Sequence, residues 1–230
     1  MSKKKVIVIS LGGSLIIPDK VDVNFLLKFK KVIKKNLNKY GFVIVCGGGS
    51  VARKYIYALK DVGINEKFQS MSGISATRMN ARFMTYFFGK DANSGIPHNM
   101  KQVKNLLRKN NIIFCGSLRY EPKETSDATS AKLANYFKTE FINLTNVQGL
   151  HDKNPIEFKN AKFIPEISWK DFDKMASKQK FHPGQHFVLD QSASKIIMKN
   201  KITTYILGKD INQLDNLLNN RKFKGTIIKG

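Results

Sequence analysis

Two glycine clusters, each placed directly after a short apolar run, constrain the possible folds of this chain more than any other feature. Residues 6–11 lead into Gly12-Gly13-Ser14, and residues 42–46 lead into Gly47-Gly48-Gly49-Ser50. β-Branched runs of this length that stop at glycine are typical of buried strands in a parallel sheet. Glycine there lets backbone N–H groups approach an anion, and the N-terminus of a following helix favours phosphate. The sequence therefore predicts two phosphate sites, one for a donor and one for an acceptor.

The rest of the chain alternates between apolar runs and amphipathic stretches, which predicts a mainly parallel α/β sheet with ligands outside the carboxyl ends of its strands. We expect further strands at residues 112–115, 141–144, 201–207 and 225–228. We expect helices at residues 22–38, 51–59, 75–88, 99–109, 125–138, 191–199 and 210–218. The polar, proline-containing residues 150–184 break this alternation, and we interpret them as an excursion or lid rather than a linker.

The composition favours a soluble intracellular protein. No apolar run reaches membrane-spanning length, and no signal-type segment follows the first lysines. The net charge of +23 would suit nucleic acid, but the lysines are spread along the chain without interleaved aromatic residues. We therefore do not expect a dedicated nucleic-acid role.

The cysteines and histidines do not predict a metal site. Cys46 and Cys115 lack a Cys or His at ligand spacing, so we expect reduced structural residues. His182 and His186 are separated by a Pro-Gly pair, which breaks the helix that would place both on one face.

Arg53 is the most informative charged residue. We expect Ser50 to cap the helix after the second glycine cluster and Arg53 to lie in its first turn. A cation there opposes the helix dipole, so its position favours an anion bound between Arg53 and the glycine amides. A solvated arginine is the alternative, since Lys54 follows it.

Asp127 and Asp190 lie near the starts of two predicted helices. Each could be only a cap. A phosphotransferase also needs carboxylates to orient lysines or hold Mg²⁺ at the transferred phosphoryl group. Because the chain also has two glycine loops, we treat Asp190 as a candidate functional residue.

Seven sequence blocks occur in series along nearly the whole chain. They are ISLGGS (9–14), CGGGSVARKY (46–55), GISATRMNA (73–81), TSDA (125–128), LTNVQGL (144–150), LDQSASKII (189–197) and GTII (225–228). In these blocks the chain resembles the amino acid kinase superfamily, and within it the archaeal-type UMP kinases. The resemblance implies a three-layer α/β/α sandwich in one domain, 1–230, with an acceptor part at about 1–145 and a nucleotide-donor part at about 146–230.

The resemblance also implies an activity and its residues. ATP would give its γ-phosphoryl group to UMP, yielding UDP for pyrimidine nucleotide biosynthesis, with Mg²⁺, in the cytoplasm, and in a homo-oligomer built from dimers, up to a hexamer. The implied catalytic positions are Ser10, Gly12 and Asp190. The implied ATP-binding residues are Gly12, Gly13, Ser14, Thr145, Asn146, Gln148, Gly149, Leu150, Lys153 and Asn154. The implied UMP-binding residues are Gly47, Gly48, Gly49, Arg53, Thr77, Arg78, Thr125, Ser126 and Asp127.

Three positions depart from the family pattern. Ser10 stands where many members carry a catalytic lysine, Gln148 where the family has aspartate, and Asn154 where Asp-Pro is usual. The lysines that could compensate are Lys3, Lys5, Lys54, Lys195 and Lys209. A kinase of another phosphorylated metabolite and a non-catalytic nucleotide-binding or regulatory protein therefore remain alternatives.

Overall fold

The fold is built around a seven-stranded sheet, seen in a computed structural model that describes residues 4–153, 155, 157–178 and 188–230. The strand order is β3-β2-β1-β4-β8-β9-β7. The strands are β1 (Lys5–Leu11), β2 (Tyr40–Cys46), β3 (Ile112–Cys115), β4 (Phe141–Leu144), β7 (Glu166–Ile167), β8 (Thr204–Leu207) and β9 (Thr226–Ile228). All neighbours are parallel except β8 and β9. The expected mainly parallel sheet is confirmed.

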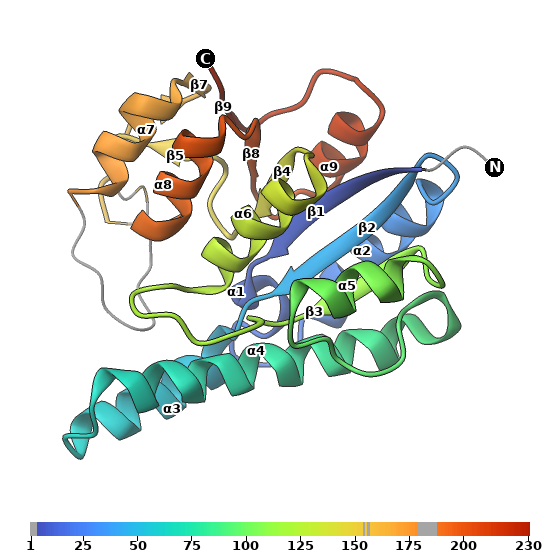
Figure 1. Cartoon of the computed structure of the whole chain (residues 1–230). Coiled ribbons are helices and arrows are strands. Elements are labelled where there is room, and N and C mark those ends of the chain that lie inside the picture. Colours follow the sequence, from blue (N-terminus) through green and yellow to red (C-terminus); the bar gives the residue numbers. More distant parts are fainter. Residues whose placement is uncertain (1–3, 154, 156, 179–187) are drawn as a thin grey trace.

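Helices cover both faces of the sheet (Figure 1). On one face lie α1 (Gly13–Ile16), α2 (Val23–Lys35), α4 (Glu66–Phe88) and α9 (Ile211–Leu218). On the other lie α5 (Met100–Leu107), α6 (Ser126–Phe137), α7 (Trp169–Ala176) and α8 (Gln191–Asn200). The alternation of side chains along β1 explains the two cores, because Ile7 and Ile9 enter one and Val8 the other. The expected three-layer sandwich is thus the observed architecture.

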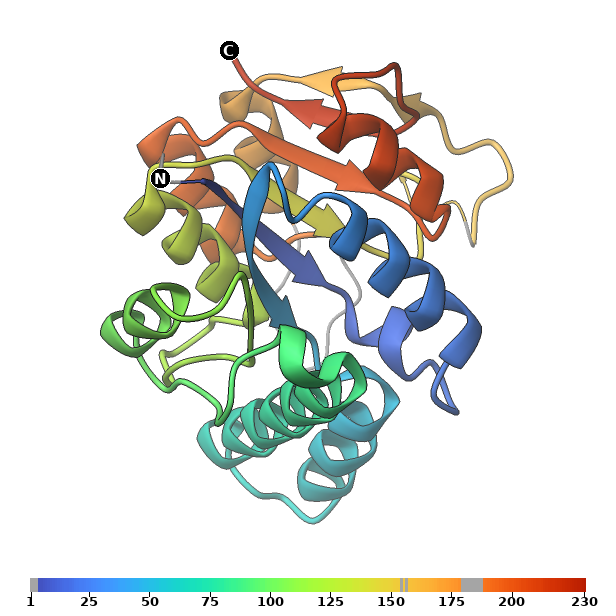
Figure 2. The same cartoon turned by 90° about the vertical axis from the view of Figure 1, so that its right-hand side faces the viewer.

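A helical hairpin of α3 (Gly49–Asp61) and α4 projects from one end of the molecule (Figures 1 and 2). We expected α4 to begin at residue 75, which was wrong: the helix begins nine residues earlier, at Glu66, because Asn65 caps it and accepts a hydrogen bond from the Phe68 amide. The apolar spacing of residues 51–59 predicts that Tyr55 faces inward beside Ala52 and Ile56, which is wrong for Tyr55, since it is 57% exposed. The hairpin buries only a narrow strip of small residues together with Ile56, so Tyr55 lies outside its contact.

Asp22, a good capping residue directly before an amphipathic run, predicts the N-cap of α2 and is confirmed, whereas the Ser50 cap expected for α3 is wrong. Asp22 accepts a hydrogen bond from the Phe25 amide at 3.0 Å. The cap residue of α3 is Gly48, and Ser50 is already its second residue, so Arg53 lies just beyond the first turn. The amide of Ser50 donates a hydrogen bond to the Ile17 carbonyl at 3.1 Å. The helix therefore begins at Gly49, before the serine that we expected to cap it.

Residues 150–184 contain more regular structure than we expected. Within their described part, β5 (Leu150–His151) pairs with β6 (Phe163–Ile164), β7 joins the edge of the main sheet, and α7 packs against α8. The sequence did not predict these short strands, because two residues are too few to show an alternation of apolar and polar side chains. His182 and His186 lie outside the described residues.

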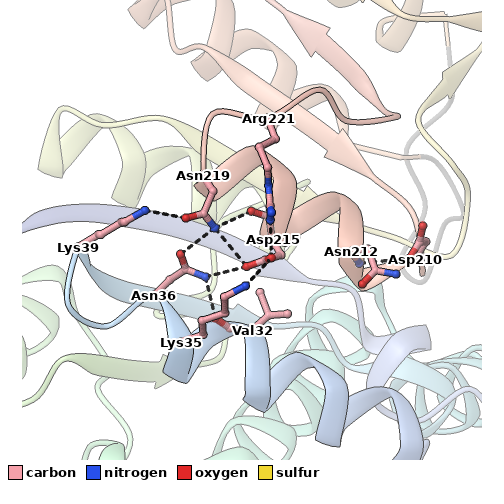
Figure 3. Close-up of polar contacts among 9 residues, drawn as sticks. All are labelled: Val32, Lys35, Asn36, Lys39, Asp210, Asn212, Asp215, Asn219 and Arg221. Carbon is pink, nitrogen blue, oxygen red and sulfur yellow. Dashed lines mark hydrogen bonds and ion pairs between the residues drawn. The ribbon is translucent and has the colours of Figure 1, made fainter.

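A polar cluster centred on Asp215 joins α2 to α9 (Figure 3). Its carboxylate accepts from Lys35 Nζ at 3.0 Å, Asn36 Nδ2 at 3.2 Å and Arg221 Nη2 at 2.5 Å. Burial alone raises the pKa of Asp215, but these cationic and amide donors outweigh it and hold the pKa below its usual value. The cluster therefore fixes two helices that cover the same face of the sheet against each other.

Candidate functional site

A cavity of about 480 Å³ opens where β1, β2 and β4 end. Its lining includes both glycine clusters, and most of the other predicted site residues face it as well. Those predicted residues are Gly12, Gly13, Ser14, Gly47, Gly48, Gly49, Arg53, Thr77, Thr125, Ser126, Asp127, Thr145, Asn146 and Asp190. Segments from both halves of the sequence thus meet in one space, at the edge of a parallel sheet where ligands bind.

The two glycine loops touch each other directly through their backbones. A Cβ atom placed on Gly13 would lie 2.0 Å from the amide nitrogen of Gly49, and one on Gly47 would lie 2.4 Å from the nitrogen of Gly13. No side chain fits at either position without moving the backbone. Glycine is therefore required here by close approach, and two anions bound to the loops would be neighbours.

Hydrogen bonds fix the conformation of the two glycine loops and leave several of their backbone N–H groups free to bind a ligand. The Gly47 carbonyl accepts from Asn80 Nδ2 at 2.7 Å, which turns it toward α4. Among the described residues, no acceptor is present for the N–H groups of Gly13, Ser14, Gly48 and Gly49. Unpaired amides at the starts of α1 and α3 form an anion-binding surface.

Arg53 supplies the positive charge of the cavity. Of the described lining residues it is the one lysine or arginine, and it has no ion pair with another described residue. Its neighbour Lys54 points elsewhere and lies 3.5 Å from Asp19. The arrangement favours the anion-binding interpretation of Arg53 over a solvated arginine.

Two carboxyl groups, those of Asp127 and Asp190, line the same cavity as the glycine loops. Ser10 Oγ donates to Asp127 Oδ1 at 2.9 Å. Asp190 accepts from the Thr125 hydroxyl, from the Thr125 amide at 3.1 Å and from the Ala193 amide at 2.6 Å. Asp190 therefore caps α8 and lines the cavity at once, while Thr125 caps α6.

The environment of these carboxyl groups favours their neutral forms. Burial raises the pKa of Asp127 to about 7; the charge of Asp190 adds to the rise and the Ser10 hydrogen bond opposes it. Burial also raises the pKa of Asp190, despite the hydrogen bonds from Thr125 and Ala193. A bound proton or a cation is therefore needed to balance the negative charge of Asp127 and Asp190.

Several predicted donor-side residues lie away from the cavity lining. Leu150 is buried, and its amide donates to Thr226 Oγ1 at 2.8 Å. Gly149 has a φ of +78° and packs against Thr226 and Phe163. Lys153 Nζ lies 5.6 Å from the ring centre of Phe158. These contacts fix the conformation of the segment after Asn146. Gln148 packs against Gly208. Asn154 lies outside the described residues.

On the acceptor side, Arg78 is the predicted residue that does not line the cavity. Its guanidinium donates to the carbonyl oxygens of Ser117 at 3.1 Å and Leu118 at 2.8 Å, and burial lowers its pKa. The Thr77 hydroxyl, in contrast, accepts from the Ser117 amide at 3.0 Å at the cavity wall. Arg78 thus fixes the loop that follows β3.

No described lysine lines the cavity in place of the one missing at Ser10. Lys5 pairs with Glu140 at 2.8 Å, at the start of β1, and Lys209 pairs with Asp22 at 2.6 Å. Lys195 lies on the exposed side of α8. Lys3 lies outside the described residues. The cavity charge is therefore set by Arg53 and by the carboxyl groups.

Sequence reasoning missed some lining residues. Asn143 is a polar residue inside the apolar strand β4, a signal that could have identified it, and its Nδ2 donates to the Val188 carbonyl at 2.5 Å. Ser70 and Ile74 were missed because α4 begins earlier than expected. Glu124 and Glu157 carry no sequence signal that places them at the cavity.

Comparisons with known proteins agree with this geometry. Residues 5–208 match the profile of the amino acid kinase family. The chain belongs to the amino acid kinase family. This membership, expected from the seven sequence blocks, is now confirmed.

Relatives of the family match nearly the whole length of this chain. The uridylate kinase of Thermoplasma volcanium is 34% identical over 224 residues, which are 97% of both chains. That of Thermococcus kodakarensis is 32% identical over 225 residues, covering 97% of this chain and 99% of the relative. The crystal structure of uridylate kinase from Archaeoglobus fulgidus superposes with a TM-score of 0.82 at 29% identity, covering 96% of this chain and 99% of that one.

Proposed function

We propose that this member of the amino acid kinase family is a UMP kinase, which transfers the γ-phosphoryl group of ATP to UMP and releases ADP and UDP. The observation that carries the proposal is the direct contact between the two glycine loops. Phosphoryl transfer needs two phosphates in line and close together. The full-length likeness to archaeal uridylate kinases supports UMP as the acceptor.

In this proposal the nucleotides divide the cavity between them. The phosphates of ATP bind Gly12, Gly13 and Ser14, and its nucleoside binds near Thr145 and Asn146, with Gln148, Gly149, Leu150, Lys153 and Asn154 as the predicted flanking positions. The UMP phosphate binds Arg53 and the second glycine loop. Thr77 and the Thr125-Ser126-Asp127 segment complete the acceptor pocket, and Arg78 supports it through Ser117.

The residues around the phosphates act through position and charge. The amides and Arg53 stabilise the negative charge that spreads over the transferred phosphoryl group. Ser10 holds the carboxyl of Asp127 by its hydrogen bond, and Thr125 holds that of Asp190. No covalent nucleophile is required, which agrees with a cavity whose lining contains no cysteine or histidine among the described residues.

The residues fit a magnesium ion carried with ATP. Two carboxyl groups whose charge is poorly balanced line the same cavity as the phosphate-binding amides, and carboxylate oxygens suit Mg²⁺. Asp127 and Asp190 would hold the ion. When bound, it supplies neutralisation of the phosphate charge.

The proposal extends to domain organisation, location and assembly. Both parts of the chain, about 1–145 and 146–230, contribute to one cavity, which supports a single catalytic domain. We place this domain in the cytoplasm. No helix among the described residues could span a membrane. The exposed side chains of Phe68, Met71, Met79 and Tyr86 lie on one face of α4, which supports a dimer-based homo-oligomer, up to a hexamer.

The test is a coupled assay of ADP release with UMP, CMP, AMP and GMP as acceptors, with and without Mg²⁺. We expect turnover with UMP that depends on Mg²⁺. Turnover with another phosphorylated metabolite but not with UMP would show that the acceptor is that metabolite and not UMP. Tight UMP and ATP binding by calorimetry without transfer would favour the non-catalytic alternative, for which the missing lysine at Ser10 is the supporting observation.

A further inference from the structure

The short strand β4 carries a buried amide among apolar residues. Asn143 is the third residue of this strand, between Ile142 and Leu144, and it is 2% exposed. Asparagine is depleted in strands, and a buried amide costs free energy unless its polar atoms find hydrogen-bond partners. The packing of the sheet alone does not require a polar side chain at this position. The amide of Asn143 therefore needs an explanation outside the sheet.

Asn143 lies next to Ser10 in the sheet, and both side chains face the same helical layer. Asn143 pairs with Ser10 on β1 and with Ile206 on β8. The residues two positions earlier, Val8 and Phe141, pack in the core that α6 and α8 cover. Side chains two residues apart in a strand share a face. Two adjacent polar side chains thus stand beside an apolar core, at the end of the strands where the cavity opens.

Each of these two polar side chains holds a segment that carries one carboxyl group of the cavity. Ser10 bonds the carboxyl of Asp127 directly, at 2.9 Å. Asn143 Nδ2 donates to the carbonyl oxygen of Val188 at 2.5 Å, two residues before Asp190. Val188, Asp127 and Asp190 all line the cavity. Two neighbouring strands therefore each hold one of the two carboxyl groups in place.

The bond from Asn143 ties the approach to Asp190 to the sheet. Leu189 is fully buried in the core, which leaves this segment little freedom to move. The carboxyl of Asp190 accepts from the hydroxyl and amide of Thr125 and from the amide of Ala193. Those bonds hold the carboxyl group between α6 and α8. The Asn143 bond instead fixes the backbone that carries the carboxyl group relative to β4.

We propose that Asn143 is a positioning residue for phosphoryl transfer, which fixes the Asp190 carboxyl relative to the strand end that binds ATP. Thr145 and Asn146 follow β4 directly and line the cavity. The inference rests on the proposed function, in which these two residues bind the donor nucleoside. Asn143 acts through the backbone of Val188 and not by contact with a phosphate. A misplacement of about 1 Å is enough to lower a rate roughly 100-fold.

Asn143→Leu tests this role, because leucine has nearly the same shape but donates no hydrogen bond. We expect kcat to fall roughly 10- to 100-fold while the KM values for UMP and ATP stay within about twofold, since alignment is lost and the binding groups remain. Asn143→Ser should give the same result and keeps a polar group beside Ser10, because its hydroxyl is one bond shorter and does not reach Val188. A rise of both KM values with kcat unchanged would overturn the proposal.

Asn36→Leu is the matched control. Asn36 is 1% exposed, and its Nδ2 donates to the Val32 carbonyl at 2.9 Å. It lies at the end of α2, away from the described cavity lining. Both variants remove a buried amide, so urea unfolding should show a loss of stability in each, whereas kcat should fall in the Asn143 variants alone. An equal fall of kcat in Asn36→Leu would assign the effect to general destabilisation and overturn the proposal.

A double-mutant cycle with Asp190→Asn tests whether Asn143 acts through Asp190. Asparagine is also a good N-cap, so α8 should still form. In the Asp190→Asn protein, Asn143→Leu should lower the residual single-turnover rate by less than about twofold, because the carboxylate that Asn143 positions is already absent. A further fall of about tenfold or more would show an independent role for Asn143 and overturn the proposal.

Amide hydrogen exchange of the nucleotide-free protein does not depend on turnover. The amide of Ala193 bonds the carboxyl of Asp190, and the amide of Ser194 bonds its carbonyl. We expect both amides to exchange about tenfold faster in Asn143→Leu and at the wild-type rate in Asn36→Leu. Unchanged exchange in Asn143→Leu would overturn the proposal. If UMP were not a substrate, the faster exchange would persist while UDP formation was absent.

Discussion

The hydroxyl of Ser10 donates a hydrogen bond of 2.9 Å to a carboxylate oxygen of Asp127, which lies 117 residues further along the chain. The bond connects the end of β1 to the first turn of α6 and reaches a carboxyl group whose pKa burial raises to about 7. Because it favours the charged carboxylate, it opposes that rise. This chain thus has a neutral donor at the position where the family resemblance implies a lysine.

Ser10→Ala tests this relationship through the pH dependence of the reaction. Loss of the hydrogen bond raises the pKa of Asp127 further, so the acidic limb of the kcat/KM profile should move to higher pH by roughly one unit. Ser14→Ala is the control, since Ser14 lines the same cavity without a hydrogen bond to either carboxyl group. A limb that stays in place in Ser10→Ala would contradict the ionised role of Asp127.

Asp127→Asn should stabilise the nucleotide-free protein at alkaline pH. In the unfolded chain the carboxyl loses its proton near pH 3.9, and in the folded protein near pH 7. Between these values the folded state binds more protons, so the free energy of unfolding falls as pH rises. The amide removes this penalty. We expect a gain on the order of 2–4 kcal/mol at pH 8 and a smaller gain at pH 5, measured by urea unfolding.

The same variant should lose catalytic activity, because the amide cannot carry the negative charge of the carboxylate. Stability and activity therefore move in opposite directions. An Asp127→Asn protein no more stable than wild type at pH 8 would show that the carboxyl is not held in an unfavourable environment.

Arg53→Ala should weaken UMP binding far more than ATP binding. A charge-assisted hydrogen bond to phosphate contributes about 1.5–3 kcal/mol, so the KM for UMP should rise roughly 10- to 100-fold. Lys54→Ala is the matched control, because it removes the next cation on α3, which faces Asp19 instead of the cavity. Equal effects on both nucleotides would show that Arg53 lies between the two phosphates.

Gly49→Ala should disrupt nucleotide binding because the added Cβ has no space. It would lie 2.6 Å from the Gly13 carbonyl oxygen and 2.7 Å from Ile17 Cγ2, at a φ of +64°. Gly63→Ala is the control, since Gly63 has a φ of +76° but open space around it. We expect Gly63→Ala to lower the thermal midpoint slightly without changing kinetics, as the cost of a positive φ is about 1 kcal/mol. Similar kinetic losses in both variants would show that the positive φ, and not the lack of space for a Cβ atom, causes the loss of activity.

Asp215→Asn should weaken the contact between α2 and α9. The carboxylate accepts charge-assisted hydrogen bonds from Lys35 and Arg221 and is 14% exposed, so we expect a loss of about 1–3 kcal/mol at pH 7 by urea unfolding. Because the pKa of Asp215 is lowered on folding, this contribution is lost as pH falls through its titration. Asp19→Asn, at an exposed pair, should leave stability nearly unchanged. Equal effects of the two changes would mean that burial does not strengthen the Asp215 cluster.

The sequence by itself determined the elements whose causes are local. Apolar runs that end in glycine marked β1 and β2, and Asp22 marked the start of α2. The glycine clusters also predicted two loops that need residues without side chains, and the structure brings these loops into direct backbone contact. The seven blocks identified the family, which the comparisons confirmed.

Only the tertiary structure decided how distant segments combine. The start of α4 at Glu66, the pairing of β7 with β9, and the antiparallel β9 depend on packing that no local pattern records. The Ser10–Asp127 bond and the Asn143–Val188 bond depend on which strand ends and loops lie side by side. Burial and neighbouring charge set the pKa of a carboxyl group, and both arise only when the sheet brings together residues more than a hundred positions apart.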